Sequence, residues 1–134
     1  MEHDTLQKAV KSAENLDHFL IATVDQEGQP HIAAAGELTL SGKDSVELTD
    51  WFCMTTIANL RHNSRVSVVI WDQIKDSGYQ LLGEAEKVED VAMMDGYSHE
   101  FEEGAALPQV ERRLTVRIGT IFDFSLRGQS DREK

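Results

Sequence analysis

The sequence predicts a mainly antiparallel β fold of the α+β class, with about six strands forming a barrel-like sheet. Short segments rich in apolar and β-branched residues recur along the chain, and turn signals containing Gly or Pro separate them. Helical patterns stand between some of these segments, an order typical of an antiparallel sheet with inserted helices. The 134 residues fit a single domain, 1–134, with a charged tail at 125–134 that we expect to be frayed.

The strands are expected where apolar residues are densest or alternate with polar ones. They are predicted at 19–24, 31–40, 46–54, 65–71, 79–88 and 114–125. The first three, joined by turns at 25–30 and 41–45, are predicted to form a meander. Gly83, inside the fifth strand, marks a bulge or a close approach to the backbone.

Three helices are expected. At 6–16 the apolar residues recur at helical spacing, which predicts an amphipathic helix. A short helix over 56–63 is predicted between the third and fourth strands. A second amphipathic helix over 90–104 is predicted before the last strand, with its apolar residues on one face.

Composition narrows the choice of partners and location. The net charge is −11, with acidic residues dense from Glu84 to Glu111, so nucleic acid is excluded as an expected partner. No run approaches the roughly 18 apolar residues of a spanning helix. The N-terminal residues are charged throughout and lack the apolar core of a secretory signal, so we expect a cytoplasmic protein. The single cysteine, Cys53, excludes an intrachain disulfide, and the five histidines lack metal-site spacing, so no metal is expected.

One stretch, "FCMTTIANLRHNSRVSVVIWD" at 52–72, gathers many polar groups around the start of the short helix. A helix N-terminus stabilises an anion by ~0.3–1 kcal/mol, and the hydroxyls of Thr55 and Thr56 are donors to such an anion. The alternative is an ordinary cap, with Thr56 as the N-cap residue. Asn59 either takes part in anion binding or ties the helix to a neighbouring loop. From the residues alone, both interpretations stay open.

Three successive segments, "FLIATVDQEGQPHIA", "TTIANLRHNSRVSVVIWD" and "LLGEAEKVED", resemble the pyridoxamine 5′-phosphate oxidase-like FMN-binding split β-barrel family. The matching residues are Asn59, Leu60, Asn63, Arg65, Val66, Ser67, Val68 and Asp72, followed by Gly83, Ala85, Val88 and Asp90. The resemblance covers about residues 6–125. It implies a six-stranded split β-barrel with short flanking helices, and a homodimer that binds FMN at the subunit interface.

The resemblance also implies where FMN would lie. It places the phosphate at the start of the short helix, and the ring beside residues 33–36 and 51–54. The small residues of 33–36 would offer a flat surface to a planar ring, although such a run is also common where a strand packs closely on a helix. The residues expected to bind the cofactor are Ala34, Ala35, Gly36, Cys53, Met54, Thr55, Thr56, Asn59, Leu60, Arg61 and Arg65.

The sequence departs from the family at the expected phosphate site. Many members carry a lysine or arginine where this chain has Thr55 and Thr56. Since charge-assisted hydrogen bonds hold a phosphate better than neutral hydroxyls do, the missing cation would weaken FMN binding. The charge would have to come from Arg61, from Arg65 or from the partner subunit. Arg61 and Arg65 are four residues apart and would share a helix face if the helix extends that far.

The activity is constrained mainly by the C-terminus. The chain ends in "FDFSLRGQSDREK", which lacks the Arg- and His-bearing substrate motifs of the true oxidase, so we expect a different reaction. The main hypothesis is a small FMN-dependent oxidoreductase acting on a small molecule or a redox protein, with no catalytic side chain indicated. The alternatives are a non-enzymatic dimeric module for flavin or another planar anionic ligand, and a family member that has lost FMN. The deazaflavin F420 stays open as an alternative cofactor, although its longer anionic tail would require more positive charge than the sequence shows.

Overall fold

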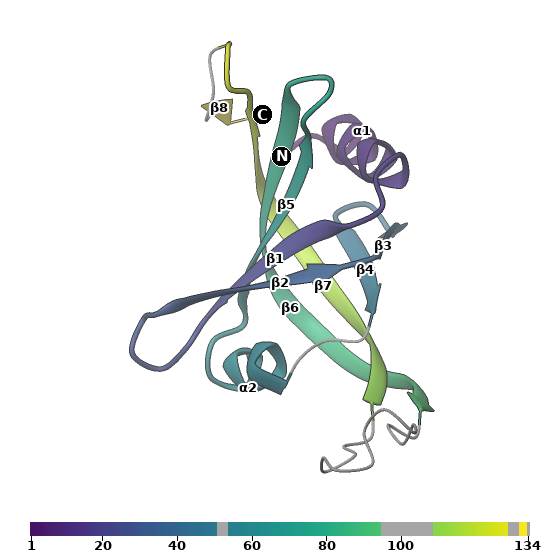
Figure 1. Ribbon diagram of the computed structural model, residues 1–134, viewed down its shortest axis with the longest axis vertical. Coiled ribbons are helices and arrows are strands. Elements are labelled where there is room, and N and C mark those ends of the chain that lie inside the picture. Colours follow the sequence, from purple (N-terminus) through teal and green to yellow (C-terminus); the bar gives the residue numbers. More distant parts are fainter. Residues whose placement is uncertain (51–53, 95–108, 129–131, 134) are drawn as a thin grey trace.

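The computed structural model describes residues 1–50, 54–94, 109–128 and 132–133 (Figure 1). These contain two helices and one sheet of eight strands. The elements are α1 His3–Glu14, β1 Phe19–Val24, β2 Pro30–Ala35, β3 Glu37–Ser41, β4 Ser45–Asp50, α2 Met54–His62, β5 Arg65–Asp72, β6 Ser77–Met94, β7 Gln109–Phe124 and β8 Arg132–Glu133. Neither helix has the length and apolar character needed to cross a bilayer.

The strand order explains the barrel-like curvature. The order is β2-β1-β5-β6-β7-β4-β3, every paired neighbour is antiparallel, and the short β8 pairs with β7. β2 and β3 lie at opposite ends of this order, yet only Gly36 separates them in the chain. The sheet must therefore curl until its two ends meet near Gly36, without closing. This confirms the predicted antiparallel α+β class and the split β-barrel.

The predicted strand at 31–40 is two strands in the structure. Both Ala35 and Leu38 are buried, although residues three apart in one regular strand point to opposite faces. The break at Gly36 changes the phase of the alternation, so that both side chains enter the core. The predicted three-strand meander is consequently divided, with β1–β2 at one end of the sheet and β3–β4 at the other.

The predicted helix at 90–104 is wrong over its first five residues. These residues belong to β6, where Asp90 pairs with Arg112 and Met94 pairs with Gln109. The apolar spacing suits a helix locally, but pairing with β7 provides backbone partners along most of the segment, with a bulge between Asp90 and Ala92, and extends β6 to 18 residues. The remainder of the prediction, 95–108, lies outside the described residues.

The two helices lie in different places on the curled sheet (Figure 1). α1 packs against β3 and β5, and α2 packs against β1 and β2. α1 begins and ends slightly earlier than predicted, and its buried face consists of Leu6, Ala9, Val10 and Ala13. These residues join the inward-facing strand residues in one hydrophobic core.

Gly83 shows the close approach predicted from the sequence. The register of β6 against β7 shifts between Leu82 and Gly83. A Cβ added at Gly83 would overlap the backbone carbonyl of Arg117 and lie 2.9 Å from Val116 Cγ1. The absence of a side chain at position 83 therefore lets the two strands come together at this irregularity.

Candidate functional site

The start of α2 turns its two threonines in different directions. Met54 and Thr55 are exposed, whereas Thr56 is only 1% exposed and lies among buried residues. The two adjacent hydroxyls therefore do not form one open pair of donors on this chain. Thr55 is the hydroxyl in this turn that solvent reaches.

Asn59 ties α2 to the sheet. Its Nδ2 donates a hydrogen bond of 3.0 Å to Thr23 Oγ1, and both side chains are buried. Of the two roles predicted for Asn59, the structure supports the tie, with β1 rather than a loop as the partner. An unpaired buried amide or hydroxyl costs about 1–3 kcal/mol, so the bond has a clear structural value.

A groove of about 530 Å³ lies over β1, β5, β6 and β7, and we refer to it as the Arg65 groove. Its lining consists of Ala22, Thr23, Val24, Pro30, Arg65, Val66, Ser67, Leu82, Gly83, Glu84, Arg117 and Gly119. The walls are mainly small or apolar, and two arginines supply positive charge. Thr23, the partner of Asn59, belongs to this lining, so α2 supports one wall of the groove through that hydrogen bond.

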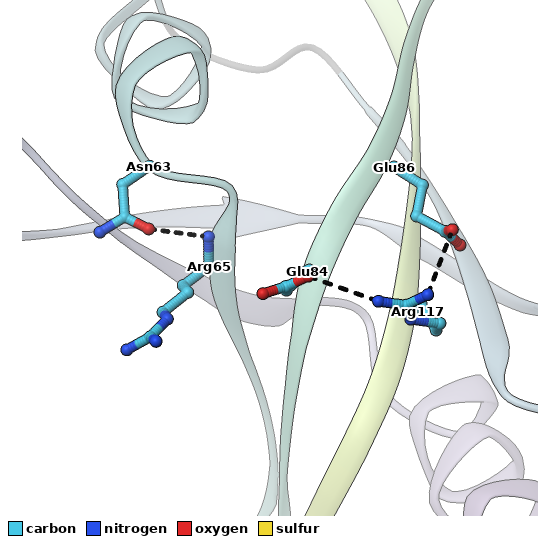
Figure 2. A network of polar contacts seen from close by, with 5 residues as sticks. All are labelled: Asn63, Arg65, Glu84, Glu86 and Arg117. Carbon is cyan, nitrogen blue, oxygen red and sulfur yellow. Dashed lines mark hydrogen bonds and ion pairs between the residues drawn. The ribbon is translucent and has the colours of Figure 1, made fainter.

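Three charged residues stand in a row across this groove. Arg65 on β5 pairs in register with Glu84 on β6, and Glu84 pairs with Arg117 on β7. Arg117 Nη2 donates to Glu84 Oε2 at 3.4 Å, and Arg117 Nη1 lies 4.0 Å from Glu86 Oε2. Figure 2 shows Glu84 between the two arginines, with the Arg65 guanidinium directed away from it.

The Arg65 guanidinium forms no ion pair with any residue that the structure describes. Its backbone N–H donates to Asn63 Oδ1 at 3.0 Å, which fixes the start of β5 (Figure 2). A hydrogen bond thus holds the backbone of Arg65, while its guanidinium lies at the groove without an ion-pair partner among the described residues. Such a cation is suited to an anionic ligand.

Arg61 lies in a different groove. α2 ends at His62, so Arg61 stands on the helix and Arg65 begins a strand, and the two do not share a helix face. The second groove, which we refer to as the Arg61 groove, has a volume of about 430 Å³. Its lining is Ile57, Leu60, Arg61, Ala85, Glu86, Lys87, Val88, Asp90 and Arg112. Leu60 and Arg61, both predicted to bind the cofactor, thus lie apart from the lining that contains Arg65.

The predicted ring-side residues are divided between the surface and the core. Ala34 and Gly36 are exposed, whereas the side chain of Ala35 is buried. Strand alternation is the reason, because successive side chains point to opposite faces. The run of small residues therefore does not present one flat face. Cys53 lies outside the described residues.

An apolar surface continues from the Arg65 groove over the outside of the sheet. Cross-strand neighbours share a face, and two such rows cross five strands. The first row is Ala34, Leu20, Val69, Gln80 and Phe122, and the second is Ile32, Ala22, Ser67, Leu82 and Thr120. We refer to these ten residues as the outer face. Ile32 is 63% exposed within it.

Sequence reasoning did not single out Glu84, Arg117 or Ile32 for a site. A partial signal was present for Arg117, because it alternates with apolar residues in a strand predicted to be half-buried. Its proximity to Arg65, 52 positions earlier, depends on strand register that the sequence alone does not specify.

A family comparison adds to this geometry. Residues 6–119 match the sequence model of the family described as pyridoxamine 5′-phosphate oxidase. The chain belongs to this family. A sequence comparison with curated proteins finds no match.

Solved structures with similar folds agree with this membership. An FMN-binding protein from Syntrophomonas wolfei has 19% identity, with 96% of this chain and 91% of that chain covered and a TM-score of 0.68. A pyridoxamine 5′-phosphate oxidase-related, FMN-binding protein from Nostoc punctiforme has 10% identity, coverages of 97% and 86%, and a TM-score of 0.66. HupZ from Group A Streptococcus has 19% identity, coverages of 94% and 97%, and a TM-score of 0.63. At these identities the likeness shows the fold alone.

Proposed function

We propose that this member of the pyridoxamine 5′-phosphate oxidase family is an FMN-binding oxidoreductase. Family membership supports the proposal, and two proteins of similar fold are described as FMN-binding. The observation that carries it is the Arg65 groove, in which a cation without an ion-pair partner among the described residues adjoins a wall of small residues.

The size and the chemistry of the groove support FMN as its ligand. Ligand pockets have volumes of about 300–1,000 Å³, and the Arg65 groove has about 530 Å³. Ala22 and Gly119 leave room for a planar ring beside the strands. Arg65 would hold the phosphate through charge-assisted hydrogen bonds. Bound FMN would supply the electron-transfer chemistry, while the protein supplies binding and orientation.

We assign the binding of the FMN phosphate to the cation of Arg65 rather than to the start of α2. Thr56 is buried, and the Asn59 side chain already bonds Thr23, so neither presents an open donor on this chain. Asn59 would act indirectly, by holding the groove residue Thr23 in position.

The same proposal includes a homodimer formed through the outer face. Apolar residues such as Leu20 and Ile32 are exposed there, and Ala22, Ser67 and Leu82 belong both to this face and to the groove lining. A second copy of the chain seated on this face would remove apolar surface from water and close the groove from outside.

The phosphate assignment is tested by titrating FMN and following the quenching of its fluorescence. Arg65→Gln should weaken FMN binding by about 10- to 100-fold, because a charged hydrogen-bonding partner is lost. Arg61→Gln is the matched control and should stay within about twofold of the unchanged protein. Absence of FMN binding by the unchanged protein would contradict the proposal, and a larger effect of Arg61→Gln would move the phosphate to the Arg61 groove.

The oxidoreductase activity is tested on the FMN-loaded protein. Bleaching of the flavin absorbance by a nicotinamide donor, followed by recovery in air, supports an oxidoreductase. A flavin that nicotinamide donors leave oxidised supports the alternative of a non-enzymatic binding module.

A further inference from the structure

Arg117 is the second cation of the Arg65 groove, and a weak ion pair holds it. Its contact with Glu84 is 3.4 Å and its contact with Glu86 is 4.0 Å, both at long distances for ion pairs. All three side chains are about half exposed, at 54% for Arg117, 51% for Glu84 and 46% for Glu86. Exposed pairs of this kind are screened by solvent and break easily.

We propose that the groove takes a doubly charged phosphate monoester through Arg65 and Arg117 together, and that Glu84 sets the affinity by competing for Arg117. This rests on the proposed function in that FMN is one such monoester. Glu84 is a specificity-determining residue in this proposal. Its carboxylate lies between the two arginines, at the position where a phosphate bound to both of them would lie.

The register places the two arginines within reach of one anion. Adjacent strands lie about 4.8 Å apart, so Arg65 and Arg117, two strands apart, are separated by roughly 10 Å at the backbone. Both side chains are long and exposed, and each can turn toward a group over Glu84. A phosphate presents more oxygen acceptors and more charge than a carboxylate, and its pairing with two guanidinium groups is correspondingly favoured.

The charge balance of the row explains why Glu84 would limit affinity. Arg65, Glu84 and Arg117 together carry one net positive charge, against the two negative charges of a phosphate monoester. Replacing Glu84 by Gln keeps the size of the side chain, leaves Arg117 with its 4.0 Å contact to Glu86 alone among the described residues, and gives the row two net positive charges. Affinity for a dianion should therefore rise more than affinity for a monoanion of the same shape.

The test compares phenyl phosphate with phenyl sulfate, which have the same shape and differ in charge, by calorimetric titration at pH 8. Glu84→Gln should strengthen phenyl phosphate binding by about three- to tenfold and phenyl sulfate binding by less. Arg117→Gln should remove the preference for phosphate over sulfate, and Arg65→Gln should weaken both ligands. Glu47→Gln, which removes a partly buried partner of another β7 arginine, Arg113, at 3.7 Å, is the matched control and should change neither affinity.

The outcomes separate this inference from FMN binding. An affinity for phenyl phosphate that is unchanged in Glu84→Gln, or a phosphate preference that survives Arg117→Gln, overturns the inference even if FMN binds. Undetectable binding of phenyl phosphate to the unchanged protein also overturns it. A rise in Glu84→Gln together with loss in Arg117→Gln supports it even if FMN itself does not bind. Melting temperatures of the variants, expected to stay close to that of the unchanged protein, exclude misfolding as the cause.

Discussion

The Arg65 groove and the Arg61 groove are similar in size but differ in how their charges are used. In the Arg61 groove, Arg61 also has no ion-pair partner among the described residues, but Arg112, 15% exposed in its side chain, donates to Asp90 at 3.1 Å, and Lys87 lies 3.5 Å from Glu89. In the Arg65 groove, Arg65 has no ion-pair partner among the described residues, and Arg117 has only long contacts. Two arginines four positions apart thus reach different surroundings, because α2 ends between them. Sequence proximity alone is a poor guide to a shared anion site.

The largest expected effect comes from adding a side chain at Gly83, where β6 and β7 approach each other closely in the Arg65 groove. Gly83→Ala should destabilise the protein by about 1–3 kcal/mol or more, because the new Cβ would overlap the Arg117 carbonyl, which belongs to the backbone and cannot rotate away. Urea denaturation measures the loss. Gly119→Ala is the matched control in the same groove, since the atom nearest to a Cβ added there, the carbonyl oxygen of Leu82, is 4.0 Å away. Equal stability of the two variants would contradict the close packing at Gly83.

The next effect concerns the support that α2 gives to the wall of the Arg65 groove. Asn59→Ala should cost roughly 1–3 kcal/mol in urea denaturation, because it leaves the buried hydroxyl of Thr23 without this donor. Asn15→Ala removes an exposed amide that contacts Lys11 O at 3.4 Å and should change stability by less than about 0.5 kcal/mol. A cost for Asn59→Ala as small as that of the control would show that the bond to Thr23 contributes little.

A third change tests whether the outer face beside the Arg65 groove is covered by a second copy. Ile32→Glu should weaken the homodimer by at least about tenfold, since a charge would be buried in an apolar contact. Light scattering after size-exclusion chromatography measures the mass as a function of concentration. Ile74→Glu, at a 96% exposed position between β5 and β6 and outside the two outer-face rows, should leave the dimer intact. A monomeric unchanged protein would refute the homodimer outright.

The smallest effect is expected in the Arg61 groove. Lys87→Gln breaks an ion pair whose side chains are 63% and 36% exposed, and it should cost under about 0.5 kcal/mol. FMN affinity, measured by fluorescence quenching, should stay within about twofold. A large loss of FMN affinity would reverse the ranking of the two grooves.

Much of the architecture was predictable from local patterns. Alternation and turn signals located the strands from β1 to β7, and the family resemblance indicated the split barrel, which the structure and the family match confirm. The break at Gly36 was missed because its effect, a change of phase between Ala35 and Leu38, appears only when the sheet curls. The helix predicted from 90 failed over 90–94 because a long partner strand competes with local periodicity.

The candidate site was predictable only in part. Arg65 was named from the sequence and lies at a groove, and its role in binding FMN stays a prediction. Thr56 and Asn59 were also named, but the structure buries both, and a pattern of donors near a helix start does not show which of them solvent reaches. Glu84 and Arg117 were added to the candidate site only because the pairing of β5, β6 and β7 places them beside Arg65.

The sequence by itself determined the class of fold, the approximate places of the strands and the short helix, and the acidic character that makes positive charge scarce. Those properties follow from periodicity and composition, which are local or additive along the chain. The tertiary structure decided which cations share a groove, which hydroxyls are buried and which face stays apolar and exposed. Those properties depend on register and curvature, which arise from pairing between distant segments and change every neighbour when they shift.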